Sequence, residues 1–135
     1  MTRYLLDTGV ASDYINRRSG VFERARSEVA TGNRIGIGVP VLAELLYGIE
    51  LSTSRAINLQ RLKVAMTTLT CWPLDEASAA EYGRIAADLR RRGRPMQIMD
   101  MLIAAIAMTL NDCVVISKDS DLSAVAGLRV ANWTT

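Results

Sequence analysis

Three acidic side chains of this chain lie inside apolar stretches, where a carboxylate is unexpected. Asp7 directly follows the run YLL, Glu44 lies within PVLAELLYGIE, and Asp100 lies within MQIMDMLIAAIA. Two further acids, Asp119 and Asp121, come shortly after the apolar run CVVIS. A carboxylate away from water is costly unless it is paired with a cation or bound to a metal. These positions therefore predict a shared site rather than solvated surface charge.

The residue types that the chain lacks narrow the chemistry of such a site. There is no histidine, which excludes serine–histidine and cysteine–histidine nucleophiles, histidine general bases and the usual zinc sites. Several carboxylates without histidine or thiolate are typical of a site for Mg²⁺ or Mn²⁺. Such an ion most often serves reactions of phosphate esters, because it neutralises the phosphate and activates a water molecule.

Each acid also has a purely structural interpretation. Asp7 could cap the helix that follows it. Asp100 lies near a predicted helix start, where negative charge is favourable. Glu44 could pair with an arginine inside the fold, and Asp119 and Asp121 are both turn-forming residues. The metal hypothesis therefore requires that all these positions meet at one place.

The hydrophobic pattern predicts strands that alternate with helices. The predicted strands cover residues 3–7, 34–39, 71–74, 113–117 and 128–130, and the predicted helices cover residues 9–17, 20–31, 40–51, 53–69, 75–93 and 95–110. This alternation is typical of an α/β fold with a parallel sheet, right-handed crossovers and helices on both faces. Asp7 and the pair Asp119 and Asp121 follow strands, and Glu44 and Asp100 are expected in the first turns of helices. In a parallel sheet such positions converge on one edge, where ligands bind.

The sequence Asp-Thr-Gly at Asp7, Thr8 and Gly9 is also the signature of aspartic proteases, which use a pair of carboxylates. Those proteases are all-β proteins, whereas the residues after Gly9 follow a helical pattern. The α/β pattern therefore disfavours a protease.

The composition predicts one globular domain over residues 1–135. Half of the residues are hydrophobic, and no apolar run approaches the roughly 18 residues that span a bilayer. The N-terminus makes a poor signal peptide, and Cys71 and Cys113 are expected to be reduced thiols, so a cytoplasmic protein with no membrane association is predicted. Fourteen of the sixteen basic residues are arginines, a bias that suits phosphate contacts but that a GC-rich genome also produces.

Four segments resemble the PIN-domain ribonucleases, and among them the VapC-type toxins of bacterial toxin–antitoxin pairs. They are LLDT, LAELLYGIE, RGRPMQIMDMLIAAIA and VVISKDSDLSAVAGLRVANW, so the similarity spans nearly the whole chain. The resemblance implies the PIN-domain fold, an α/β fold in which a parallel sheet of about five strands lies between helices. It also implies an RNA substrate, a homodimer, and a cognate antitoxin protein whose C-terminal segment covers the acidic site.

By the same resemblance, the catalytic acids are Asp7, Glu44, Asp100 and Asp119. These four side chains are also the expected metal ligands, with Asp121 as the alternative to Asp119 or an additional ligand. The expected cofactor is Mg²⁺, with Mn²⁺ able to substitute.

Other polar residues receive supporting roles. Thr8 is expected to orient the site through its hydroxyl group or to cap a helix, and Ser117 to hydrogen-bond a water molecule near the metal. Arg92, Arg94 and Lys118 are candidates for contacts with RNA phosphates or antitoxin carboxylates. For the arginines helix capping is the alternative, and for Lys118 it is charge balance.

Three positions depart from the family pattern. Gly9 replaces the usual asparagine, Val41 replaces a common hydroxyl residue, and Leu122 replaces a common phenylalanine. These exchanges put catalytic efficiency in question more than metal binding.

The resulting hypothesis is a metal-dependent endoribonuclease toxin of a type II toxin–antitoxin system. Asp7, Asp100 and Asp119 would hold the principal ion, Glu44 would support a second ion or orient the water, and the products would carry 5′-phosphate and 3′-hydroxyl ends. One alternative is a catalytically weak or inactive PIN-fold partner of an antitoxin, with Gly9 as a sign of decay. Another is a phosphotransfer domain with Asp7 as the phosphate acceptor, although the second acid expected beside Asp7 is missing.

Overall fold

The computed structural model describes residues 1–134. Its elements are β1 (Arg3–Leu6), α1 (Thr8–Asn16), α2 (Val21–Ala30), β2 (Arg34–Gly38), α3 (Val39–Leu51), α4 (Arg55–Met66), β3 (Thr70–Trp72), α5 (Glu76–Arg91), α6 (Ile98–Thr109), β4 (Cys113–Ile116), the short 3-10 helix η1 (Ser120–Ala124) and β5 (Arg129–Ala131). The five strands pair in the order β3-β2-β1-β4-β5, and every pair is parallel. The predicted α/β fold is therefore confirmed.

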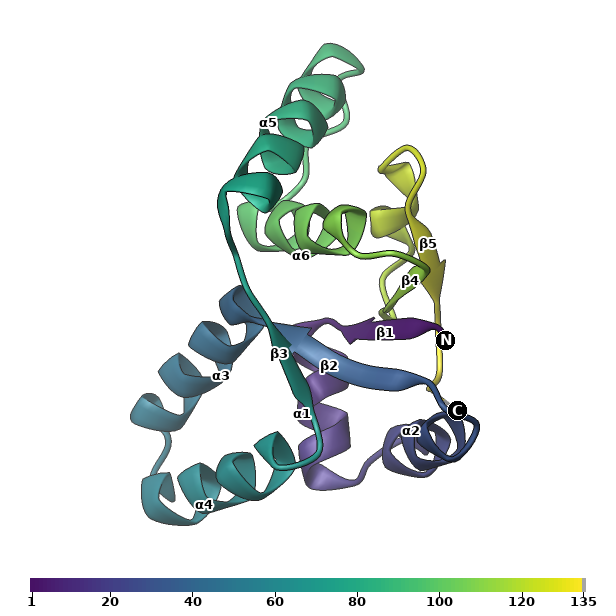
Figure 1. The fold of residues 1–135 in the computed structure, drawn as a ribbon. Coiled ribbons are helices and arrows are strands. Elements are labelled where there is room, and N and C mark those ends of the chain that lie inside the picture. Colours follow the sequence, from purple (N-terminus) through teal and green to yellow (C-terminus); the bar gives the residue numbers. More distant parts are fainter. Residues whose placement is uncertain (135) are drawn as a thin grey trace.

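The strand order places a change of direction at the centre of the sheet. The chain builds β1, β2 and β3 outward in one direction, then returns to add β4 and β5 on the other side of β1. Figure 1 shows α1 and α2 on one side of the sheet, and α5 and α6 on the other. In open α/β sheets the carboxyl ends of the two strands at such a switch point form the usual ligand site. Here those two strands are β1 and β4.

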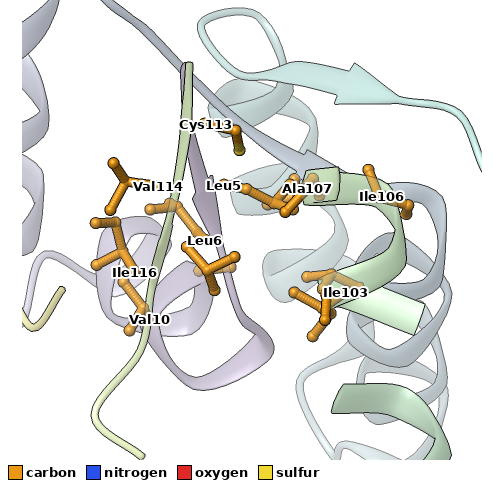
Figure 2. Close-up of a cluster of buried hydrophobic side chains, with 14 of the residues drawn as sticks. Leu5, Leu6, Val10, Ile103, Ile106, Ala107, Cys113, Val114 and Ile116 are labelled. Atoms are coloured by element: carbon orange, nitrogen blue, oxygen red, sulfur yellow. The ribbon is translucent and has the colours of Figure 1, made fainter. Parts of the chain in front are cut away.

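The central strands bury side chains on both of their faces. All four residues of β4 are buried, as are Leu5 and Leu6 of β1. In Figure 2, Ile116 lies on the side of β4 that faces Val10 of α1, whereas Cys113 and Leu5 lie towards α6. Successive residues of a strand point to opposite faces. The same alternation governs the residues that directly follow β1 and β4.

The predicted start of the last long helix is wrong by three residues. This helix, α6, begins at Ile98 rather than at Pro95. Gly93 ends the preceding helix with a positive φ of 66°, and the Arg94 N–H donates to the Leu89 carbonyl at 2.9 Å. A residue before proline is also disfavoured in the helical conformation. The segment between α5 and α6 is therefore a turn and an extended stretch.

Several apolar side chains of α2, α3 and α4 lie at the surface. The exposed fraction is 53% for Val29, 70% for Leu51 and 58% for Ile57. Leu62 of α4 and Ala25 of α2 are buried instead. No helix within residues 1–134 is long and apolar enough to cross a membrane. Both cysteines are free thiols, as predicted.

Candidate acidic active site

Asp7 lies at the carboxyl end of β1, directly beside the end of β4. Its backbone N–H donates to the Ile116 carbonyl at 3.1 Å, which extends the ladder between the two strands by one residue. Its Oδ1 accepts a hydrogen bond from the Val10 N–H at 2.9 Å and so caps α1. The capping interpretation of Asp7 is therefore correct, but it uses only one of the two carboxylate oxygens.

A tight turn after β4 places the other strand-end acids. Ser117 is buried, and its Oγ accepts from the Asp119 N–H at 2.9 Å. Oδ1 of Asp119 accepts from the Asp121 N–H at 2.8 Å and caps η1. Asp119, rather than Asp121, thus holds the turn, and both carboxylates are exposed. The observed role of the Ser117 hydroxyl is to fix the backbone at Asp119.

Glu44 reaches the site from α3. It is the sixth residue of this helix, which begins at Val39, and so lies in the second turn rather than in the first turn as predicted. The hydroxyl group of Thr8 donates to the Glu44 carboxylate. Thr8 is the first residue of α1, so this bond joins α3 to the end of β1. An arginine partner for Glu44, the structural alternative, is not found among residues 1–134.

Asp100 lies in the first turn of α6, as predicted, and is half-buried. Burial raises the pKa of its carboxyl group, and nearby negative charges raise the pKa further. Those charges belong, in order of decreasing effect, to Asp119, Asp7, Glu44 and Asp121. The structure therefore brings all five predicted acids into one electrostatic neighbourhood. A carboxyl group there is harder to ionise because it is partly buried and its neighbours are negatively charged.

The donor set at this edge fits a hard divalent cation in its chemistry, since all the acidic ligands offer oxygen. Within the described chain, however, no three of these side chains are already arranged to hold a metal ion. Asp7, Glu44 and Asp119 each commit one oxygen to a hydrogen bond within the protein. The site therefore fits a divalent cation by its oxygen donors and its negative charge, and not by a complete set of ligands already in place.

Lys118, a candidate for contact with RNA or antitoxin, forms an ion pair inside the protein. Its Nζ lies 2.7 Å from Oδ2 of Asp13, a residue of α1 whose side chain is only 9% exposed. The sequence interpretation missed Asp13. The signal for it was an acid between the apolar residues Ala11 and Tyr14, both of which are buried.

The two arginine candidates differ from each other. Arg92 caps the end of α5, where its guanidinium group donates to Asp88 at 2.7 Å and to the Ala124 carbonyl at 2.6 Å. The capping interpretation is therefore correct for Arg92. Arg94 is exposed in the segment between α5 and α6. Among residues 1–134 its side chain forms no hydrogen bond or ion pair, and its contact with RNA or antitoxin stays a prediction.

The three departures from the family pattern occupy different environments. Val41 and Leu122 are buried in the core, so these exchanges affect packing. Gly9 is exposed at the start of α1, and a side chain there would begin 3.9 Å from Oδ1 of Asp7. That is an ordinary contact distance, so the backbone at Gly9 has room for the asparagine that is usual in the family.

A groove of about 480 Å³ opens beside Thr8 and Glu44 and continues between α1, α3 and α4. Its lining is mixed, with Leu45 and Leu62 among the apolar residues and Arg61 as a basic one. The acidic site is therefore continuous with a surface that is large enough for a chain segment.

The comparisons with known proteins agree with this geometry. The family model described as PIN domain matches residues 4–128. The tRNA(fMet)-specific endonuclease VapC of Shigella flexneri is 30% identical over 99% of this chain and 100% of its own length. The chain belongs to the PIN domain family and, within it, to the VapC-type proteins.

Solved structures lead to the same family. DNA-bound VapBC from Salmonella typhimurium matches with a TM-score of 0.89 and 28% identity, over 98% of this chain and 99% of that one. VapBC-5 of Mycobacterium tuberculosis, a member of the VapBC family of toxin–antitoxin systems, matches with a TM-score of 0.69 and 25% identity over the full length of both chains. The protease interpretation of Asp-Thr-Gly is wrong, because the sheet is parallel, and family membership removes the phosphotransfer alternative.

Proposed function

We propose that this chain is a metal-dependent endoribonuclease toxin of a type II toxin–antitoxin system. The observation that carries the proposal is the convergence of acidic side chains at the carboxyl edge of β1 and β4, which also raises the pKa of Asp100. Four further carboxylates contribute to that shift, and together they form a region of negative charge that a divalent cation would neutralise. The VapC ribonucleases similar to this chain support RNA as the substrate.

The residues of this chain have distinct roles in the proposed reaction. Asp7, Asp100 and Asp119 hold the ion, which supplies charge neutralisation at the phosphate and an activated water molecule when it is bound. Thr8 orients Glu44 by engaging its Oε1, which leaves Oε2 to accept a proton or to bind an ion. Ser117 holds the backbone at Asp119 and so sets the direction of that carboxylate.

RNA cleavage with and without divalent cations tests the proposal. The purified chain should cleave RNA in Mg²⁺ or Mn²⁺ and be inactive with a chelator, and mapping of the RNA 5′ ends should show 5′-phosphates at defined positions. Initiator tRNA is a suitable first substrate, because the Shigella flexneri relative is named for it. No cleavage in either metal, together with tight antitoxin binding, would favour the inactive binding partner instead.

The proposed partners are a second copy of this chain and a cognate antitoxin. Large apolar side chains are exposed on α3 and α4, which form a helical hairpin at one end of the molecule (Figure 1). They include Tyr47, Leu51, Ile57 and Val64, with exposed fractions from 57% to 70%. An exposed apolar patch of this kind is typical of a protein interface.

Light scattering at micromolar concentration is therefore expected to return about twice the chain mass of 14.8 kDa. Tyr47→Asp should shift the protein towards the monomer, because it places a charge in the apolar patch. A wild-type mass near 14.8 kDa would contradict the homodimer.

A further inference from the structure

Asp13 is the one buried charged residue within residues 1–134, and the proposed reaction does not use it. Its Oδ2 lies 2.7 Å from Nζ of Lys118, while Nε of Arg18 is 3.9 Å from its Oδ1. Lys118 is thus the close partner. A buried carboxylate depends strongly on such a cation, since an unpaired charge in the interior is costly.

Lys118 lies in sequence between two residues of the acidic site, Ser117 and Asp119. The ion pair with Asp13 draws Lys118 to the α1 face of the sheet, the same face to which Ile116 points in Figure 2. Asp119, the next residue, lies near Asp100 of α6, because its charge has the largest effect of the neighbouring charges that raise the pKa of Asp100.

Two further hydrogen bonds hold the backbone here, and in the first of them the Ser117 N–H donates to the Ala131 carbonyl at 3.0 Å. The Asp119 N–H donates to Oγ of the buried Ser117 at 2.9 Å. Asp119 itself is exposed, and the turn that carries it lies outside the strand ladder. The ion pair of Lys118 is therefore the side-chain link between this turn and α1, the helix that Asp7 caps.

We propose that Asp13 is a positioning residue for the metal site: it holds Lys118 on α1, and this contact orients Asp119 towards Asp100. The inference rests on the proposed function. Asp13 touches neither the ion nor the RNA, and it acts through Lys118 alone. It also accounts for a lysine that lies beside the acidic cluster in sequence while its ammonium group is held by a different carboxylate.

Mn²⁺ binding to the full chain, measured by electron paramagnetic resonance, tests this inference without relying on RNA cleavage. Asp13→Asn and Lys118→Met each remove the ion pair, and each should raise the Kd for Mn²⁺ by about tenfold, as is usual when a residue that orients a metal ligand is lost. Lys118→Arg keeps a cation opposite Asp13 and should retain the wild-type Kd. Asp112→Asn is the matched control, because its ion pair with Arg129 is also 2.7 Å long but lies at the other edge of the sheet.

The double variant Asp13→Asn with Lys118→Met separates positioning from stability. It leaves the buried side chain at position 13 without a charge, and replacing both members of an ion pair is often neutral for stability. The melting temperature in chelator should therefore recover, whereas the Kd for Mn²⁺ should stay raised. Recovery of both quantities would mean that Asp13 only stabilises the fold.

Two further outcomes would overturn the inference. Wild-type Mn²⁺ binding by Asp13→Asn, or by Lys118→Met, would show that the ion pair does not orient Asp119. No Mn²⁺ binding by the wild type would overturn the proposed function and the inference with it. The two failures are distinguishable, because only the second involves the unmodified chain.

Discussion

At the amino edge of the sheet, Asp112 precedes β4 and accepts hydrogen bonds from Arg129 at 2.7 Å and from the Thr2 hydroxyl at 3.0 Å. The bond from Arg129 is the main reason why the pKa of Asp112 is lowered. At the carboxyl edge, by contrast, burial and the surrounding carboxylates raise the pKa of Asp100. At one edge of the sheet, therefore, an acid is paired with a cation of the same chain. At the other edge, burial and neighbouring carboxylates disfavour the charge of an acid.

This difference distinguishes acids that stabilise the fold from acids that are available to bind a ligand. Arg129 lies across from Asp112 on the adjacent strand, so the amino edge supplies its own cation. At the carboxyl edge the nearest lysine in sequence, Lys118, is held by Asp13. Uncompensated charge of this kind lowers stability, a cost that natural proteins commonly carry at functional sites.

The largest expected effect is on catalysis. Asp100→Asn should reduce RNA cleavage by about a hundredfold or more, because losing some 3 kcal/mol of metal-dependent charge stabilisation corresponds to that factor. Asp112→Asn should leave cleavage within about twofold of the wild type, as expected for a surface ion pair. Initial rates on one RNA in Mn²⁺ make the comparison, and equal losses in the two variants would refute the functional difference between the edges.

A smaller effect should separate the two acids that follow β4. Asp119→Ala is expected to lower cleavage by about tenfold more than Asp121→Ala. The reason is that Asp119 is proposed to bind the ion directly, whereas Asp121 is not. Asp119 is the first of the charges that raise the pKa of Asp100, and Asp121 is the last. The reverse ranking would show that Asp121 is the metal ligand.

The smallest effect concerns stability without metal. At neutral pH in chelator, Asp100→Asn should be as stable as the wild type or more stable, by about 1 kcal/mol, because it removes a repelled charge. Asp112→Asn should be less stable, because it removes a favourable pair. Thermal melts of the three proteins measure both differences. If Asp100→Asn melts lower than the wild type while Mn²⁺ still raises its melting temperature as in the wild type, the shared metal site is wrong.

The pH dependence of these melts follows from the directions of the two pKa shifts. The folded-state pKa of Asp100 is raised, so the wild type loses its repelled charge as the pH falls through that value, and the advantage of Asp100→Asn shrinks. The folded-state pKa of Asp112 is lowered, so its contribution persists to a lower pH. Melts in chelator from pH 7 to about pH 4 should show the first difference fading before the second.

Much of the fold could be predicted because its signals are local. An apolar run that ends in Asp7 and another that ends before Asp119 define the two central strands, and their lengths and flanking residues suffice to place them within a residue or two. The types and positions of the acids likewise predicted that Asp7, Glu44 and Asp100 share one site. The hydrophobic periodicity of the sequence predicts such features, because the periodicity involves only residues within one helix or strand.

Other features were decided by the tertiary structure. Asp112 has a cationic partner in Arg129, whereas the charge of Asp100 is disfavoured by other carboxylates. Which of these occurs at a given acid depends on which strands lie side by side. The pairing of Lys118 with Asp13 joins residues far apart in the sequence, across the face of the sheet covered by α1. The sequence by itself determined which residues are apolar, acidic and regularly spaced. Only the strand order and the crossovers decided which charges meet, because Coulomb and hydrogen-bond energies depend on distance in space rather than along the chain.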